Sequence, residues 1–377
     1  MTITGLLLAA LAGTAIAQSS DLVTVLNSTN GTATFSEVLA EIPGFLEAIA
    51  GKTNITVLAP NDTAIAELLA SPAGQALEDG GADYALNLVL YHVIDGGYEN
   101  ITDYAVVPTL LTSSNYTNVT GGQHIGFYWD DDEDVVGFYG GNDFAPEASH
   151  TPIPFDQGWI YVLNGVLQIP PSMSETVTSG DFNGSSFVAA LEKAGLKEEF
   201  DLLHDATYFV PVNDGFDAVE DALSKLSTEE LAEVLKYHVV AGKVWDFELL
   251  EKVSQVTTLQ GKNLTVTQTP DEEWFINQAG IHYTDLAVAG GVVLFIDNVL
   301  NPLAADFAAP RNGTDGEGLP AFTVTNATST SGTNDSTSST ASASPSIASA
   351  TSTGLAAMPL SVGISTLIGG IAVALLF

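Results

Sequence analysis

Histidine is the residue type that most often serves as a general base. Two of the six histidines in this 377-residue chain occur in a repeated sequence setting. Each follows a tyrosine, in Tyr91-His92 and in Tyr237-His238. Apolar residues precede both histidines by three, four and seven positions, which is the spacing of one helix face. These residues are Ala85, Leu88 and Val89 before His92, and Leu231, Val234 and Leu235 before His238. The pattern predicts buried, hydrogen-bonded histidines with a structural role, and not catalytic bases.

An acidic run at residues 130–134 offers oxygen ligands of the kind that calcium prefers. When alternate acids of the run are placed at the first ligand positions of an EF-hand loop, the sixth position is Val135 and the twelfth is Gly141. The loop needs glycine and glutamate there, so the template fails. We expect a solvated turn between strands at 123–129 and 135–139, with a weak oxygen-ligand site as the alternative.

Aromatic residues gather between positions 127 and 161. One interpretation is that alternate residues of a strand face a core. The other is an aromatic-lined groove that stacks a flat ligand or a partner surface. The residues of such a groove would be Phe127, Tyr128, Trp129, Phe138, Tyr139 and Trp159.

The composition excludes several classes of function. The chain has 46 acidic and 9 basic residues, a formal net charge of −37 and no cysteine. So few cations argue against nucleic-acid binding, and the lack of cysteine excludes disulfides, thiol nucleophiles and cysteine-bound metals. The six histidines show no metal-ligand spacing, and the common hydrolase, metalloprotease and phosphate-binding motifs are missing. We therefore expect no catalytic residue, no metal and no other cofactor.

Three sequence blocks occur twice in the same order, which indicates an internal duplication. The matched blocks are residues 54–65 with 207–216, 86–96 with 231–242, and 159–170 with 291–302. In each copy, residues with helical periodicity come first and short β-rich runs come last, so each copy is predicted to be an α+β unit. Strands are expected at 55–58, 161–163, 208–212, 264–267 and 292–296.

Local signals predict where helices start and stop. Thr34 with Glu37 fits a capping box, and so does Ser227 with Glu230. Pro43-Gly44 should interrupt the first helical segment.

The repeated blocks resemble the fasciclin-like (FAS1) domain. The resemblance rests on TVLAPND and YFVPVND, the two Tyr-His dipeptides, and the closing NGVLQIP and IDNVLNP. It implies two tandem domains, residues 18–170 and 171–302, each a β-sheet wedge with packed helices. It also implies a secreted or surface-attached adhesion protein, with a recognition segment at Tyr91, His92, Tyr237 and His238.

The two ends of the chain carry targeting signals. Residues 1–17 have a short apolar core that ends in Ala15-Ile16-Ala17, as a signal peptide does. Residues 303–354 contain a Ser/Thr-rich stretch that predicts a disordered, glycosylated stalk. The uncharged tail at 355–377 resembles a GPI-attachment signal, with a plain membrane helix as the alternative. We expect a GPI-anchored protein on the outer face of the plasma membrane or in the cell wall.

Asn-x-Ser/Thr triplets are frequent, and in a secreted chain they predict a glycoprotein. They occur at Asn27, Asn30, Asn54, Asn61, Asn100, Asn115, Asn118, Asn183, Asn263, Asn312, Asn326 and Asn334.

Two functions fit these observations. The first is a non-enzymatic, anchored glycoprotein that adheres to cell-wall or matrix components or to other surface proteins, with two modules giving avidity. The alternative is an auxiliary factor that orients phenolic molecules while a secreted laccase couples aromatic polyketides, as fungal proteins similar to this one do.

Overall fold

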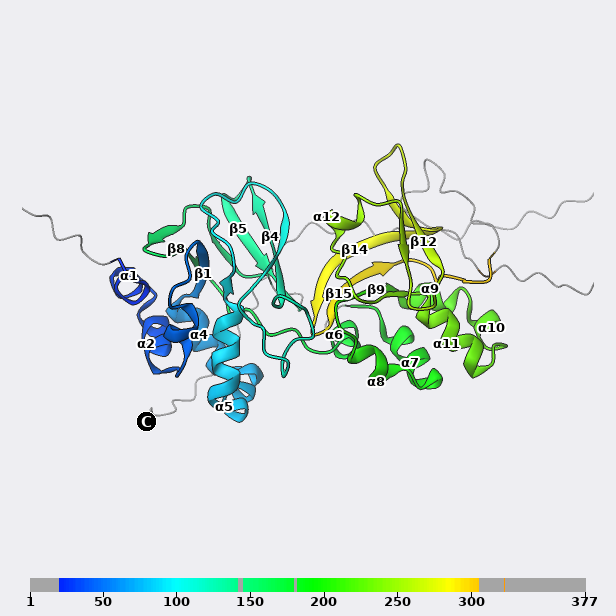
Figure 1. The fold of residues 1–377 in the computed structure, drawn as a ribbon, viewed down its shortest axis with the longest axis horizontal. Helices are drawn as coiled ribbons and strands as arrows, with labels where there is room; N and C mark the ends of the chain where they lie inside the picture. Colours follow the sequence, from blue (N-terminus) through cyan, green and yellow to red (C-terminus); the bar gives the residue numbers. More distant parts are fainter. Residues whose placement is uncertain (1–19, 142–144, 180–181, 305–321, 323–377) are drawn as a thin grey trace, which may run out of the picture. The chain divides into compact units, whose positions relative to one another are not determined.

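The structure, a computed structural model, describes residues 20–141, 145–179, 182–304 and 322. The predicted signal peptide, the apolar tail and most of the Ser/Thr-rich stalk lie outside the described residues, as do Asn312, Asn326 and Asn334. The described part contains two α+β copies, which confirms the predicted fold class (Figure 1).

Within the described residues, the first copy combines five helices with eight strands. The helices are α1 (Leu22–Ser28), α2 (Ala33–Glu41), α3 (Phe45–Ile49), α4 (Asp62–Leu69) and α5 (Pro72–Tyr91). The strands are β1 (Ile55–Pro60), β2 (Val93–Ile94), β3 (Ala105–Pro108), β4 (His124–Asp130), β5 (Val135–Tyr139), β6 (Glu147–Ser149), β7 (Ile153–Phe155) and β8 (Gly158–Leu163). They form one sheet in the order β2-β1-β8-β7 and another in the order β3-β4-β5-β6. The β4–β5 hairpin confirms the turn predicted at the acidic run.

The second copy has one seven-stranded sheet in the order β10-β9-β15-β14-β13-β12-β11. Its helices are α6 (Met173–Thr178), α7 (Ser185–Ala194), α8 (Lys197–Asp201), α9 (Asn213–Asp217), α10 (Glu220–Leu223), α11 (Thr228–Lys236) and α12 (Phe247–Leu250). Its strands are β9 (Ala206–Pro211), β10 (Val239–Val240), β11 (Gln255–Thr257), β12 (Asn263–Gln268), β13 (Trp274–Ile276), β14 (Ala279–Val288) and β15 (Gly291–Ile296). Helices α7 and α11 lie on one side of β9 and β15 (Figure 1).

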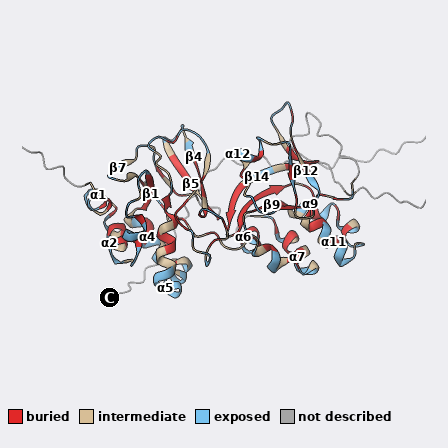
Figure 2. Ribbon diagram, in the orientation of Figure 1, coloured by how far each residue is buried: buried red, intermediate tan, exposed pale blue. Residues whose placement is uncertain are grey.

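A parallel strand pair lies at the centre of each copy. Strand β1 pairs with β8, and β9 pairs with β15 in the same way, with β2 or β10 antiparallel on the other side. Every residue of β1, β9 and β15 is buried, because both faces of these strands are covered (Figure 2). The matching arrangement is the structural counterpart of the sequence duplication.

The side chains of β1 point alternately into two apolar cores of the first copy. Ile55 and Val57 point to a cluster formed with the helices, which includes Phe35 and Leu39. Leu58 points the other way, into a cluster between the two sheets. Because side chains of a strand alternate between faces, one buried strand serves both cores.

The helix boundaries follow two of the three predicted signals. Ser227 and Glu230 form a complete capping box at the start of α11, and Pro43-Gly44 separates α2 from α3. The capping box predicted at Thr34 is wrong. Helix α2 starts earlier, and the backbone N–H of Thr34 instead donates to the carboxylate of Asp62 at 2.9 Å. A side chain distant in sequence thus takes the place of the local cap.

Among the described residues, no helix combines the length and apolarity that crossing a membrane requires.

Replacing Gly291 with alanine tests the close pairing of β9 and β15. Gly291 has φ 154°, and a Cβ atom there would lie 1.8 Å from the carbonyl oxygen of Ala206. Because the backbone would have to move, we expect the free energy of unfolding to fall by about 3 kcal/mol or more. Gly195 also has a positive φ, 67°, but faces open space, so Gly195→Ala should cost only about 1 kcal/mol. Equal losses in urea unfolding would contradict the steric explanation.

Candidate functional site

The histidine of the first dipeptide is buried and hydrogen-bonded on both ring nitrogens. Nδ1 of His92 lies 2.8 Å from the carbonyl oxygen of Leu88, one helical turn earlier in α5. Nε2 accepts the backbone N–H of Leu167 at 3.0 Å. Because a backbone N–H needs an acceptor, Nε2 is unprotonated and Nδ1 carries the hydrogen. The imidazole therefore ties the end of α5 to the segment that follows β8.

The second copy repeats this arrangement. Nδ1 of His238 lies 2.8 Å from the carbonyl oxygen of Val234, and Nε2 accepts the backbone N–H of Leu300 at 2.9 Å. Burial lowers the pKa of His92 and of His238 to about 4. Both rings are thus neutral at pH 7 and have no free nitrogen for a substrate, which is the structural role that the helical spacing indicates.

The two tyrosines are buried beside the histidines. The hydroxyl of Tyr91 donates to the carbonyl oxygen of His124 at 3.1 Å. The hydroxyl of Tyr237 donates to the carbonyl oxygen of Asn263 at 2.9 Å and accepts from the side-chain amide of Asn277 at 3.0 Å. All four dipeptide side chains are at most 2% exposed, so they do not themselves form a contact surface. A recognition role predicted for this segment rests on its exposed neighbours.

A buried threonine organises the loop after the first dipeptide. The hydroxyl of Thr56, in β1, donates to the carbonyl oxygen of Gly96 at 2.8 Å and accepts the backbone N–H of Tyr98 at 2.9 Å. Tyr98 is half-buried, and its ring packs edge-on against Phe127 at 5.0 Å. We call residues 95–98 the first presenting loop.

The second presenting loop, residues 241–245, is held in the same manner. The hydroxyl of Thr207, in β9, donates to the carbonyl oxygen of Lys243 at 3.2 Å and accepts the backbone N–H of Trp245 at 2.7 Å. The ammonium nitrogen of Lys243 lies 3.5 Å from the centroid of the Trp245 ring, a cation–π contact. Sequence reasoning missed these threonines, although each stands at the same place in its β-rich block. Each copy therefore holds one aromatic residue, Tyr98 or Trp245, at an equivalent position.

The structure does not bring the six aromatic residues of the predicted groove together. Phe127 and Phe138 lie in the core between the sheets, with ring centroids 6.2 Å apart. Trp129 is exposed on β4 and stacks on His150 at 4.8 Å. Trp159 belongs to β8 in the other sheet. The prediction of a single groove is wrong, because the pleat sends neighbouring residues to opposite faces.

The remaining two residues of the predicted groove lie over glycines on the opposite face of the β3–β6 sheet. Tyr128 is paired across the strands with Gly137, and Tyr139 with Gly126. A Cβ atom would lie 2.4 Å from the ring of Tyr128 if placed at Gly137, and 2.0 Å from the ring of Tyr139 if placed at Gly126. Each ring therefore covers the backbone of the facing strand, as aromatic residues do beside strand glycines.

A third tyrosine on this face connects the two copies. Tyr104 stacks on Tyr139 with centroids 6.0 Å apart, and its hydroxyl donates a short hydrogen bond to the carboxylate of Asp285 in β14. The other carboxylate oxygen accepts the backbone N–H of Phe247 at 2.7 Å. Asp285 is 3% exposed, and burial raises its pKa to about 6.

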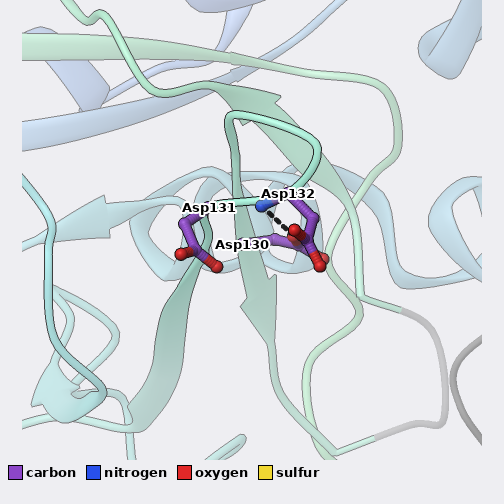
Figure 3. A group of neighbouring side chains, drawn as sticks. All are labelled: Asp130, Asp131 and Asp132. Carbon is purple, nitrogen blue, oxygen red and sulfur yellow. Dashed lines mark hydrogen bonds between the residues drawn. The ribbon is translucent and has the colours of Figure 1, made fainter.

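The acidic run forms an exposed turn whose first three carboxylates lie within 4.8 Å of one another (Figure 3). One carboxylate oxygen of Asp130 accepts the backbone N–H of Asp132 at 3.0 Å and that of Glu133 at 3.2 Å. Asp130 thus caps its own turn, and Asp131 and Asp132 are exposed. This matches the solvated turn expected from the sequence.

Nine of the predicted glycosylation sites fall within the described residues, and none of them is buried. Asn61 and Asn118 are half-buried, and Asn61 caps α4. The exposed ones are Asn27, Asn30, Asn54, Asn100, Asn115, Asn183 and Asn263. Their occupancy by sugar stays a prediction.

The buried imidazoles make stability depend on pH. Their folded pKa of about 4 lies below the ordinary 6.5, so their contribution is complete above pH 6.5 and is lost as the pH falls toward 4. Each ring should account for about 3 kcal/mol of this loss. His92→Gln or His238→Gln should lower stability at pH 7 and flatten the dependence on pH, whereas the exposed His204→Gln should not. An unchanged slope of unfolding free energy against pH in both buried variants would contradict this assignment.

Asp285 should act with the opposite sign. Its pKa of about 6 exceeds the ordinary 3.8, so the folded state favours the protonated carboxyl. The free energy of unfolding should therefore fall by about 3 kcal/mol as the pH rises from about 4 to about 6. Asp285→Asn should remove this fall, while the exposed Asp95→Asn should retain it. Urea unfolding at pH 4, 5 and 6 measures the difference, and the assignment fails if both variants keep the slope.

Known proteins resemble this chain over most of its described length. The model of the Fasciclin domain matches residues 16–170 and 183–302. A "Fasciclin-like arabinogalactan protein" of Arthroderma benhamiae is 28% identical over 304 residues, which cover 80% of this chain and 70% of the relative. "Fasciclin-like arabinogalactan protein elcF" of Phaeosphaeria nodorum is 30% identical over 294 residues, which cover 76% of this chain and 90% of the relative.

A solved structure was also matched, that of a FAS1 domain pair from the insect cell adhesion molecule Fasciclin I. It is 18% identical, covers 72% of this chain and 97% of that chain, and has a TM-score of 0.35. The family match covers both copies of the duplicated unit. This chain therefore belongs to the Fasciclin domain family and carries the domain twice.

Proposed function

We propose that this protein is a non-enzymatic, GPI-anchored surface glycoprotein that adheres to cell-wall or matrix components, or to other cell-surface proteins, through its two fasciclin domains. The single observation that carries the proposal is the pair of Fasciclin domain matches, since the family is generally non-catalytic and adhesion-type. Relatives named arabinogalactan proteins support a glycosylated protein, as do the accessible asparagines.

The contact surface is assigned to the two presenting loops. The buried threonines fix the backbone of both loops, so little conformational freedom is lost when a partner binds. Tyr98 and Trp245 provide aromatic area, and aromatic residues are frequent anchors of protein contacts. Lys243 adds a cation beside Trp245 in a strongly acidic chain. Two such loops on one chain permit binding by avidity.

A cell-attachment assay tests the proposal. The full chain is produced on the surface of non-adherent yeast, and attachment to isolated cell wall and to other cells is counted. Tyr98→Ala combined with Trp245→Ala should lower attachment at least about tenfold, because both modules lose their anchor. Trp129→Ala, which removes an exposed aromatic residue elsewhere, should leave attachment unchanged. Treatment with a phospholipase that cleaves GPI anchors should release the protein.

Attachment no greater than that of cells without the protein would overturn the adhesion role, and resistance to the phospholipase would overturn the GPI anchor.

The second candidate function, an auxiliary factor for a secreted laccase, is favoured by one observation, an apolar cavity in the first copy that has the size of an aromatic ring. A laccase coupling assay that gives the same products with and without the full chain would exclude it.

A further inference from the structure

The first copy contains an apolar cavity of about 140 Å³ among helices α2, α4 and α5. Phe35 and Val38 of α2, Ile65 and Leu68 of α4, and Val89 of α5 form much of its wall. Three of these side chains, those of Phe35, Ile65 and Val89, belong to the helical core, so the cavity is a gap in that core with an opening to the surface. Leu69, which is 58% exposed, also lines it and marks the opening.

The wall offers almost nothing to a polar ligand. Apart from Thr34 and His92, all the lining residues are apolar. Both nitrogens of His92 are already bonded to backbone groups of Leu88 and Leu167. A polar group in this cavity would lose its hydrogen bonds to water without replacing them. An apolar cavity of about 150 Å³ stays dry and binds a benzene molecule, so the volume here suits one aromatic ring.

The second copy differs at the same place in the fold. Ile65 is the fifth residue after Pro60, the last residue of β1, and Phe216 is the fifth residue after Pro211, the last residue of β9. The hollow beside Phe216 lies among α7, α9, α10 and α11, the counterparts of the helices around the first cavity. Its volume is larger, about 350 Å³, and its lining includes the charged residues Lys193, Asp217 and Glu220.

The second copy has the phenyl ring of Phe216 where the first copy has the smaller side chain of Ile65. The ring of Phe216 packs 6.3 Å from that of Phe187, which in turn lies 5.8 Å from the ring of His238. His238 does not line the hollow of the second copy, whereas His92 lines the cavity of the first. The copy with isoleucine at this position thus has a cavity that reaches its buried histidine, and the copy with phenylalanine does not.

From this comparison we infer that the cavity of the first copy is a binding site for an uncharged aromatic ring. The ring is either a free small molecule or the end of a larger one whose polar part stays at the opening beside Leu69. At the matching position of the second copy the chain itself carries a phenyl group, that of Phe216. The inference does not depend on the adhesion role, whose proposed contact surface is the presenting loops and not this cavity.

Toluene is the probe for this site. With the full chain near toluene saturation, we expect the melting temperature to rise by about 2 °C or more, because the ligand binds the folded state alone. Methyl NMR signals of Ile65, Leu68 and Val89 should shift with a common, saturable dependence on toluene concentration. Ile65→Phe fills the cavity as Phe216 does, so it should weaken toluene binding at least about tenfold without lowering the melting temperature of the free protein.

The controls separate the cavity from other apolar parts of the same chain. Leu68→Phe is a second filling variant, used should Ile65→Phe not fold. Ala189→Phe, at an exposed position on the hollow of the second copy, should leave the toluene effect intact. Absence of saturable methyl shifts, or equal toluene binding by wild type and a folded filling variant, would overturn the inference, whatever the result of the attachment assay.

Discussion

A neutral imidazole buried between a helix end and a closing segment is the interaction on which each copy depends. His92 bonds to Leu88 in its own helix and to Leu167, which lies 75 residues away in sequence. His238 does the same across 62 residues. A ring that donates on one side and accepts on the other satisfies two backbone groups that water cannot reach. Because β2 and β10 begin at the next residue, the same contact fixes where each presenting loop starts.

The sequence predicts those parts of the fold that depend on local period and cap chemistry. The spacing around His92 and His238 indicates their burial, and Ser227 with Glu230 marks a helix start. Partners distant in sequence escape such reasoning. Asp62 caps the helix near Thr34 from another element, and no local signal shows it. Alternation likewise tells which strand residues share a face but not what covers that face. The sequence therefore predicts one groove for an aromatic segment whose residues lie in four separate places.

The duplication allows the two copies to be compared as natural variants of one scaffold. Backbone-directed groups are shared: the imidazoles, the threonines Thr56 and Thr207, and the glycines that begin β8 and β15. Groups that face solvent or an internal gap differ, such as Tyr98 against Trp245. Residue identity is therefore tightly constrained where a side chain hydrogen-bonds to buried backbone groups, and loosely constrained where it faces solvent or an internal cavity. A difference in function between the copies must lie at residues of the second kind.

The buried titratable groups also decide on which side of neutral pH the fold is weaker. Two imidazoles together should lose about 6 kcal/mol on acidification to pH 4, while Asp285 should return about 3 kcal/mol over nearly the same range. The histidine effect is the larger of the two. The net charge of −37 works in the other direction, because protonation of surface carboxylates relieves repulsion, but exposed charges are well screened by salt. At physiological ionic strength the balance therefore favours the fold near neutral pH, and the hydrogen bonds of the two imidazoles are the reason.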